Sequence, residues 1–192
     1  MYPTLKDKDY VVINKCYIGF RVPRNLFEIP WIGVLCYYCC SETYVKNVLQ
    51  RTKKVNFTRW GTFSPIKRGD IIAFNNPFLM NSYAIKRCVA LPGDSIKQYL
   101  EGVHSPWITP FSKVPYKGMR IYEKDLSSAE KKILKRNSLF QYVERDSVFV
   151  AKNNGYFVLG DNRIHSEDSR LWGIISEDLI IGKLELVIKR ND

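Results

Sequence analysis

"GYFVLGDNRIHSEDSRLWG", residues 155–173, passes from an apolar strand-like segment into an unusually polar turn. Its first five residues are glycine, aromatic or aliphatic, which is typical of a buried strand. From Gly160 to Trp172, most side chains carry a charge or form hydrogen bonds. An ordinary turn needs only a glycine and one or two polar side chains. We therefore expect this turn to have a chemical role as well as a structural one.

The rest of the chain contains many short apolar segments separated by glycine or proline turns, and little helix. We predict a helix over residues 128–135, with Ser127 or Ser128 as its N-cap, and expect residues 44–54 to form either a short basic helix or a hairpin arm. The predicted strands are residues 9–15, 70–74, 82–91 (before the turn at 92–94), 147–150 and 156–159, and a last strand with a bend at Gly182. This pattern predicts a mainly antiparallel β fold.

Composition limits the function classes without choosing among them. The 192 residues carry a formal net charge of +11, which suits nucleic acid, anionic lipid or an acidic partner. No secretory signal opens the chain. The longest apolar run, residues 29–40, is about half of the ~20 residues that span a bilayer. That run is either a membrane-contacting loop with Trp31 at the interface, or a buried pair of strands.

The five cysteines do not form a recognisable metal site. Cys36, Cys39 and Cys40 lie close together, but there are only two histidines and no second cysteine pair at zinc-ribbon spacing. We interpret these cysteines as small apolar side chains in a buried or membrane-facing loop. We predict neither a metal nor a cofactor.

Four segments in order resemble the sequence boxes of type I signal peptidases. They are "MYPTL" (1–5), "RGDIIAF" (68–74), "IKRCVALPGDSI" (85–96) and the opening turn. These enzymes are membrane-anchored Ser-Lys proteases that remove signal peptides from exported proteins. The resemblance implies a mainly β fold: an antiparallel sheet and coiled-barrel catalytic core with a small inserted α+β subdomain. We expect the core in residues 1–100 and 154–192, and the inserted cap in residues 101–153.

The resemblance assigns Lys86 as the general base and Ser166 as the serine that orients it. It makes Asp168 and Arg170 a supporting ion pair, and Asp161 and Arg87 further polar partners of the site. A lysine has an ordinary pKa near 10.4 and becomes a base at neutral pH only when it is desolvated. A position among apolar strand residues provides that condition. Without the boxes, Lys86 would be interpreted as a surface lysine, and Ser166 as a turn serine.

The same resemblance implies the partners and the location. Met1, Leu5 and Ile85 fall where the family's pockets hold the small −1 and −3 residues of the signal peptide; ordinary core packing is the alternative. The bound peptide adds as a β-strand. We expect contact with the membrane lipid surface through residues 29–40, no nucleic-acid partner, and a location on the outer face of the bacterial cytoplasmic membrane.

The start of the chain departs from the family pattern. In the family's first box the nucleophilic serine directly precedes the methionine that corresponds to Met1. We therefore expect this chain to be a fragment without its nucleophile and membrane anchor, and inactive as a peptidase. A true pseudoenzyme is a weaker interpretation because Lys86 and Ser166 are retained.

Two rival interpretations remain at this stage. A self-cleaving repressor of the Ser-Lys type shares the fold superfamily, but it would need an upstream DNA-binding domain and cleavage site. A basic nucleic-acid-binding module fits the charge, yet the chain shows no helix-turn-helix, RNP or zinc-finger pattern.

Overall fold

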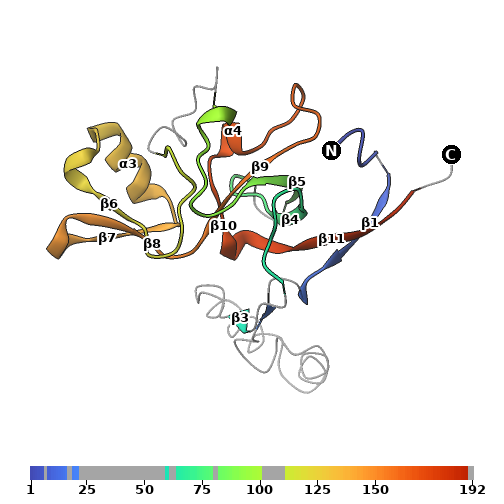
Figure 1. Cartoon of the computed structure of the whole chain (residues 1–192), viewed down its shortest axis with the longest axis horizontal. Helices are drawn as coiled ribbons and strands as arrows, with labels where there is room; N and C mark the ends of the chain where they lie inside the picture. The colour runs from blue at the N-terminus through green and yellow to red at the C-terminus, as the bar shows by residue number, and fades with distance from the viewer. Residues whose placement is uncertain are drawn as a thin grey trace, which may run out of the picture.

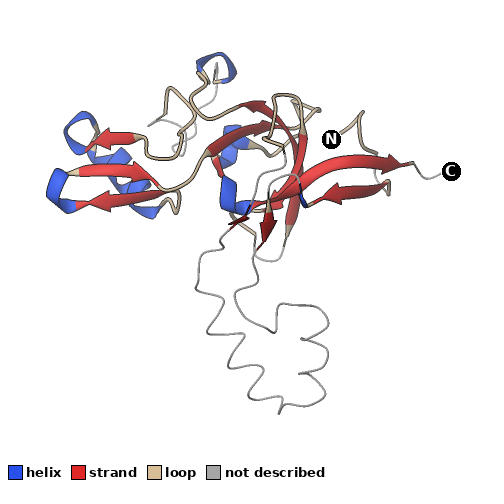
Figure 2. Cartoon of the chain, turned by 60° about the horizontal axis from the view of Figure 1, so that its bottom comes forward, coloured by secondary structure: helices blue, strands red, loops and turns tan. Residues whose placement is uncertain are grey.

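The computed structural model describes residues 1–6, 8–16, 19–21, 59–60, 64–79, 82–100 and 111–189. Strands dominate this part of the chain (Figure 2). Every strand pairing in it is antiparallel. The mainly antiparallel β prediction is therefore confirmed.

The larger sheet has six strands in the order β1-β11-β4-β5-β9-β10. These strands are β1 (Tyr10–Asn14), β4 (Ile71–Asn75), β5 (Tyr83–Ala90), β9 (Gly155–Leu159), β10 (Ile175–Ser176) and β11 (Ile180–Ile188). Strand β5 lies inside the sheet, with Lys86 opposite Ile72 of β4 and Arg87 opposite Leu159 of β9. Because hydrogen bonds hold β5 on both sides, its side chains start from a fixed backbone.

A smaller sheet lies at the end of the molecule opposite the two termini (Figure 1). Its strand order is β6-β8-β7, with β6 (Arg120–Tyr122), β7 (Phe140–Val143) and β8 (Val148–Ala151). Helix α3 (Ser128–Arg136) packs beside β7. Ser127 caps α3 through a reciprocal pair of hydrogen bonds with Glu130, which is the predicted start signal. A separate pair joins β2 (Phe20–Arg21) to β3 (Arg59–Trp60).

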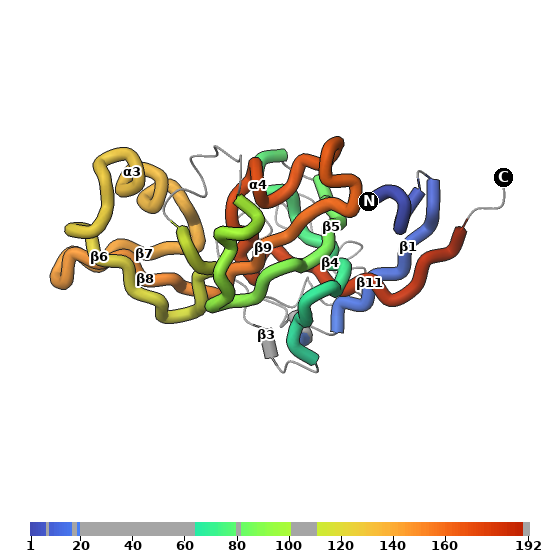
Figure 3. Tube along the Cα trace, turned by 45° about the horizontal axis from the view of Figure 1, so that its top comes forward, coloured from blue at the N-terminus to red at the C-terminus, as the bar shows by residue number. Residues whose placement is uncertain are grey.

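Two clusters of buried side chains form the core of the part of the chain that the structure describes. The first cluster joins the two sheets, because Phe149 of β8 and Leu134 of α3 pack in the same cluster as Phe157 of β9. The second lies within the larger sheet and includes Ile72, Phe74, Cys88, Val158 and Ile180. Strands β5 and β9 run side by side (Figure 3). The division into residues 1–100 plus 154–192 and an inserted 101–153 stays a prediction.

Turn chemistry agrees with the sequence at two glycines. Gly93 follows β5 with a φ of +90°, and Asp94 N–H donates to the Leu91 carbonyl at 3.0 Å, closing the predicted turn. The register of β11 against β4 shifts between Ile180 and Gly182, which is the predicted bend. Strand β8 begins one residue later than predicted because Ser147 adopts a left-handed conformation with φ 48°.

The remaining elements are short. Helix α4 (Ser169–Trp172) follows the polar turn, and single 3-10 turns occur at Lys97–Tyr99, Glu123–Asp125, Glu144–Asp146 and Glu177–Leu179. Within the described ranges, no helix has the length and apolar character needed to cross a membrane. Residues 29–40, predicted to contact lipid, and residues 44–54, predicted as a helix or a hairpin arm, lie outside the described residues.

Candidate active site

Lys86 and Ser166 meet, although they are 80 positions apart in the sequence. Lys86 Nζ donates a hydrogen bond of 2.9 Å to Ser166 Oγ. Both side chains are half-buried. Burial lowers the pKa of Lys86 because it penalises the ammonium form. Asp168 and Glu167 oppose that change in pKa, and Arg170 adds to it.

The backbone at Gly160 leaves the space in which these two groups meet. A Cβ atom at this position would lie 1.9 Å from Ser166 Oγ and 3.5 Å from Lys86 Nζ. Heavy atoms that are not bonded do not approach to 1.9 Å, so any side chain here would displace Ser166. The glycine of the Gly-Asp-Asn sequence therefore has a steric role at the site.

Asp168 anchors the polar turn from inside the protein. Its side chain is 0% exposed. The carboxylate accepts hydrogen bonds from Gly160 N–H at 3.0 Å and from the Arg170 guanidinium at 2.9 Å through each oxygen. Burial raises the pKa of Asp168, but these hydrogen bonds outweigh burial and leave the pKa below its usual value. The same carboxylate caps α4 by accepting from Arg170 N–H.

A second ion pair joins the polar turn to β5 and to the start of the chain. Arg87 binds Asp161 through two parallel hydrogen bonds of 2.8 Å, the strong bidentate geometry. The Thr4 hydroxyl donates a short hydrogen bond to the same carboxylate. Arg87 also donates to the Gly69 carbonyl at 2.8 Å. The Arg87 hydrogen bonds lower the pKa of Asp161, and Thr4 and the amino group of Met1 lower it further.

An aromatic ring also faces the lysine. Lys86 Nζ lies 5.6 Å from the centroid of the Trp172 ring. Trp172 ends α4, whose first residue, Ser169, accepts a hydrogen bond from Val158 N–H of β9 at 3.0 Å. The fold thus brings two neighbours of the lysine, Ser166 and Trp172, from the same polar turn and the helix that follows it.

The predicted pocket residues are less clearly placed. Met1, Leu5 and Ile85 are each half-exposed and belong to neither buried cluster of the described chain. Leu5 N–H donates to the Met1 carbonyl at 3.1 Å, which closes the first turn of the chain. Core packing therefore does not account for these three residues, and their assignment to substrate pockets stays a prediction.

Three contributors were not predicted from the sequence: Thr4, Gly160 and Trp172. Thr4 and Gly160 belong to motifs that were recognised, so the signal was present but no contact was assigned to them. Trp172 gives no local signal, because an aromatic residue near the end of a polar turn is more often part of the core.

The arrangement supplies a proton acceptor. A desolvated amine that is held by a hydroxyl can take a proton from a second hydroxyl nearby and return it later. Among the residues that the structure describes, no group of His, Cys, Asp and Glu side chains has the arrangement of a metal site. The two ion pairs, Arg87–Asp161 and Arg170–Asp168, hold the polar turn that carries Ser166.

Comparison with known proteins gives a consistent set of relatives. Residues 1–189 match the family described as "Signal peptidase, peptidase S26". Signal peptidase I of Pseudomonas aeruginosa is 26% identical over 200 residues, which cover 95% of this chain and 59% of that protein. Signal peptidase I V of Bacillus subtilis is 33% identical over 129 residues, 62% of this chain and 65% of that protein.

A crystal structure of a signal peptidase I from Enterococcus faecalis aligns with 28% identity and a TM-score of 0.33. The alignment covers 64% of this chain and 98% of that one. A TM-score of 0.33 supports no argument about the fold. The chain spans about 60% of the length of the Pseudomonas and Buchnera relatives that it matches.

Proposed function

The chain belongs to the signal peptidase family, peptidase S26, and from this premise we propose that it is the catalytic part of a protease that removes signal peptides from exported preproteins. The observation that carries the proposal is the 2.9 Å hydrogen bond between Lys86 Nζ and Ser166 Oγ. It joins the two residues to which the family motifs assign the base and its orienting serine. The lowered pKa of Lys86 supports the same assignment.

In this proposal Lys86 is the general base of a Ser-Lys pair. Its neutral amine takes the proton from the serine hydroxyl that the family motif places directly before Met1. The serine oxygen then forms a bond to the carbonyl carbon of the scissile peptide, and the new ammonium returns the proton to the leaving amine. A water molecule, deprotonated by the same amine, then bonds to the acyl carbonyl carbon. The bond from that carbon to the serine oxygen breaks, and the ammonium returns the proton to the serine.

The geometry at the start of the chain supports this route. The amino group of Met1 is close enough to Asp161 to lower its pKa, and Asp161 adjoins Gly160, which borders Lys86 and Ser166. A residue joined to Met1 would therefore begin on the side of Asp161, the neighbour of Gly160 in the polar turn. Thr4 ties this segment to Asp161 and restricts where that residue can lie.

In this proposal the substrate class and the cellular location are those of the signal peptidase family. The cleaved bond follows small residues at −1 and −3, held in shallow pockets to which Met1, Leu5 and Ile85 contribute. The substrate strand adds to the catalytic sheet. The protein works at the outer face of the bacterial cytoplasmic membrane, in contact with lipid.

The test is a preprotein cleavage assay with the chain that carries a serine directly before Met1. Lys86→Met should abolish cleavage, and Ser166→Ala should reduce it by less, because Ser166 orients the base without accepting the proton. Lys183→Met is the matched control, because Lys183 is also a half-buried sheet lysine and pairs with Asp70 at 2.7 Å. Cleavage that persists in Lys86→Met, or an equal loss in Lys183→Met, would contradict the proposal.

A further inference from the structure

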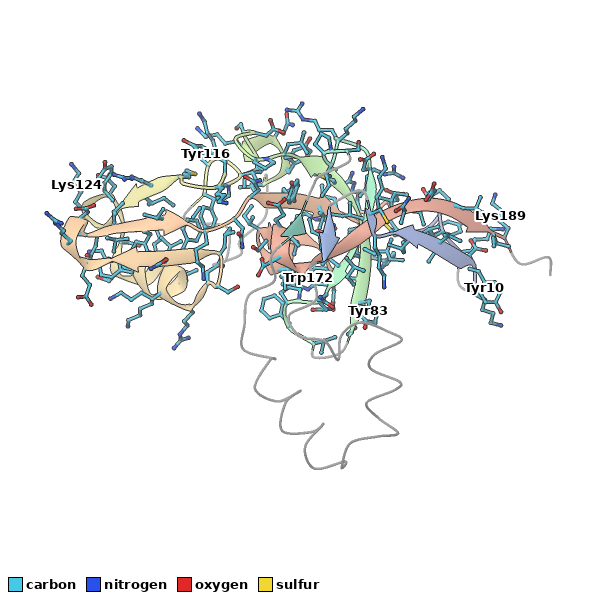
Figure 4. The ribbon with its side chains drawn as sticks, turned by 90° about the horizontal axis from the view of Figure 1, so that it is seen from below. Tyr10, Tyr83, Tyr116, Lys124, Trp172 and Lys189 are labelled. Atoms are coloured by element: carbon cyan, nitrogen blue, oxygen red, sulfur yellow. The ribbon has the colours of Figure 1, made fainter. Side chains whose placement is uncertain are left out.

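The indole of Trp172 lies over the amine of Lys86. The distance from Nζ to the ring centroid is 5.6 Å. The indole is half-buried and also packs edge to face against the Phe74 ring, with 6.1 Å between the two ring centroids. Figure 4 shows Trp172 in the middle of the molecule, between the small sheet that ends near Lys124 and the strands that end near Lys189. The indole is thus fixed between the core and the amine.

The position of the indole depends on the same carboxylate that fixes the polar turn. Trp172 N–H donates to the Asp168 carbonyl at 2.8 Å, and the Asp168 side chain caps the helix that carries Trp172. The Asp168 carboxylate also holds Gly160 N–H beside Ser166. Ser166 and Trp172 are therefore placed against Lys86 by one buried residue.

A ring in this position has two opposite effects on a lysine. Its face attracts the ammonium form, and its apolar body excludes the water that would stabilise that form. The attraction is weak here, because 5.6 Å is close to the limit of about 6 Å for a useful cation–π contact. The charged groups near the amine do not by themselves explain its lowered pKa. Asp168 and Glu167 favour the ammonium form, and Arg170 opposes it. Burial has the largest effect on the pKa of Lys86 and lowers it.

We propose that Trp172 is a positioning residue for the general base, and that its indole keeps bulk water from the Lys86 amine so that the amine is neutral when the serine must lose its proton. The proposal rests on the proposed function for the role of Lys86 in cleavage. The exclusion of water from the Lys86 amine by Trp172 does not depend on any substrate.

The direct test is NMR titration of the lysine side chains in the chain of residues 1–192, with the Lys86 signal identified by its loss in Lys86→Met. Trp172→Ala admits water, so the pKa of Lys86 should rise toward the ordinary lysine value. Trp172→Leu keeps an apolar cover without the ring face, so the pKa should stay low or fall further. Tyr99→Leu is the matched control: it removes a ring stacked on Phe157 in the other cluster and should leave Lys86 unchanged.

A fall in the pKa of Lys86 in Trp172→Ala would overturn the inference, because ring attraction would then dominate, and so would no change at all. If Trp172→Ala does not fold, Trp172→Gln brings a polar group to the amine in a longer side chain, and the same rise is expected. In the cleavage assay, the rate at pH 7 should fall about tenfold for each pH unit by which the pKa rises, and should recover at high pH.

The two arms separate this inference from the proposed function. If the pKa of Lys86 moves as expected but the chain with a serine directly before Met1 does not cleave even without further substitutions, the inference stands and the proposed function fails. If the parent chain cleaves and the pKa does not respond to Trp172, the inference alone fails.

Discussion

The polar turn of residues 160–168 with helix α4, and the small sheet of β6, β7 and β8 with helix α3, both carry charged side chains in short turns. The two regions place these charges differently. In the polar turn, the Asp168 carboxylate is 0% exposed and faces a half-buried lysine. Beside the small sheet, Lys131 of α3 and Glu123 of the turn after β6 form an ion pair that spans 3.5 Å, with side chains 32% and 28% exposed.

This difference shows where the fold keeps a buried charge that makes its stability sensitive to substitution. A buried charge is stable only while all of its partners remain, and its loss is expensive. An ion pair that keeps part of its contact with water contributes little and can be lost easily. The small sheet and α3 are stabilised by apolar side chains such as Phe149 and Leu134, whereas the polar turn contains a fully buried carboxylate, Asp168, that must keep its hydrogen-bond partners.

The largest expected effect is on Asp168. Asp168→Ala leaves Arg170 and Gly160 N–H without their buried acceptor, so the free energy of unfolding should fall by about 3–5 kcal/mol. Glu123→Gln, the matched change beside the small sheet, removes the charge of the Lys131 pair but keeps an oxygen that can accept from the Tyr142 hydroxyl, so it should lower the free energy of unfolding much less. Urea denaturation of both variants measures the contrast. Equal losses would mean that the two regions do not differ in the way described.

A smaller effect is expected at the glycines. Gly160→Ala forces Ser166 to move, because the new Cβ would lie 1.9 Å from Ser166 Oγ, and should cost about 1–3 kcal/mol of stability and most of the cleavage activity. Gly118→Ala, in the turn before β6, meets nothing within 4 Å, and only its φ of +84° makes it costly, by about 1 kcal/mol. Its cleavage rate should be unchanged. Retained activity in Gly160→Ala would show that Ser166 is not needed in its observed position.

Ser127→Ala tests the small sheet by itself. Loss of the cap of α3 should lower the free energy of unfolding by about 1 kcal/mol. Cleavage at a temperature where the variant stays folded should match the parent chain. A strong loss of activity without unfolding would connect the small sheet to the site in a way that the present contacts do not explain.

The smallest expected effect is the pH dependence of stability contributed by Lys86. The pKa of Lys86 is lower in the folded chain than the usual 10.5, so between these two values the unfolded chain binds more protons. Stability should therefore rise with pH through that interval, and the destabilising contribution of Lys86 is full below it. Lys86→Met should remove this rise and be at least as stable at pH 7. Denaturation midpoints between pH 7 and pH 11 measure it, and an unchanged rise in the variant would assign it to another group.

The sequence predicted the regular parts of the fold because their signals are local. Alternating or continuous apolar residues indicated β1 and β9, and the Ser127–Glu130 pair indicated the start of α3. Strands β6 and β7 were missed, since each mixes polar and apolar residues over only three or four positions and shows neither a period nor the continuous apolar run of β8. The interpretation of residues 29–40 lies outside the described residues.

For the site, the sequence was informative only through its motifs. Lys86 and Ser166 were paired by the resemblance, because no local pattern predicts a contact between residues 80 positions apart. The contact of Thr4 with Asp161 spans 157 positions and was not predicted. The place of Trp172 over the lysine depends on how α4 packs against Phe74, which the order of residues does not reveal.

The central claim is that a neutral Lys86 is the base for signal-peptide cleavage, and its most direct test is the pH dependence of kcat/KM for a preprotein cut by the chain with a serine directly before Met1. The account predicts that kcat/KM rises with pH along a limb whose midpoint coincides with the NMR titration of Lys86, below the ordinary lysine value. It also predicts that the limb moves upward together with that titration in Trp172→Ala. A limb that does not follow the titration of Lys86 would contradict the account.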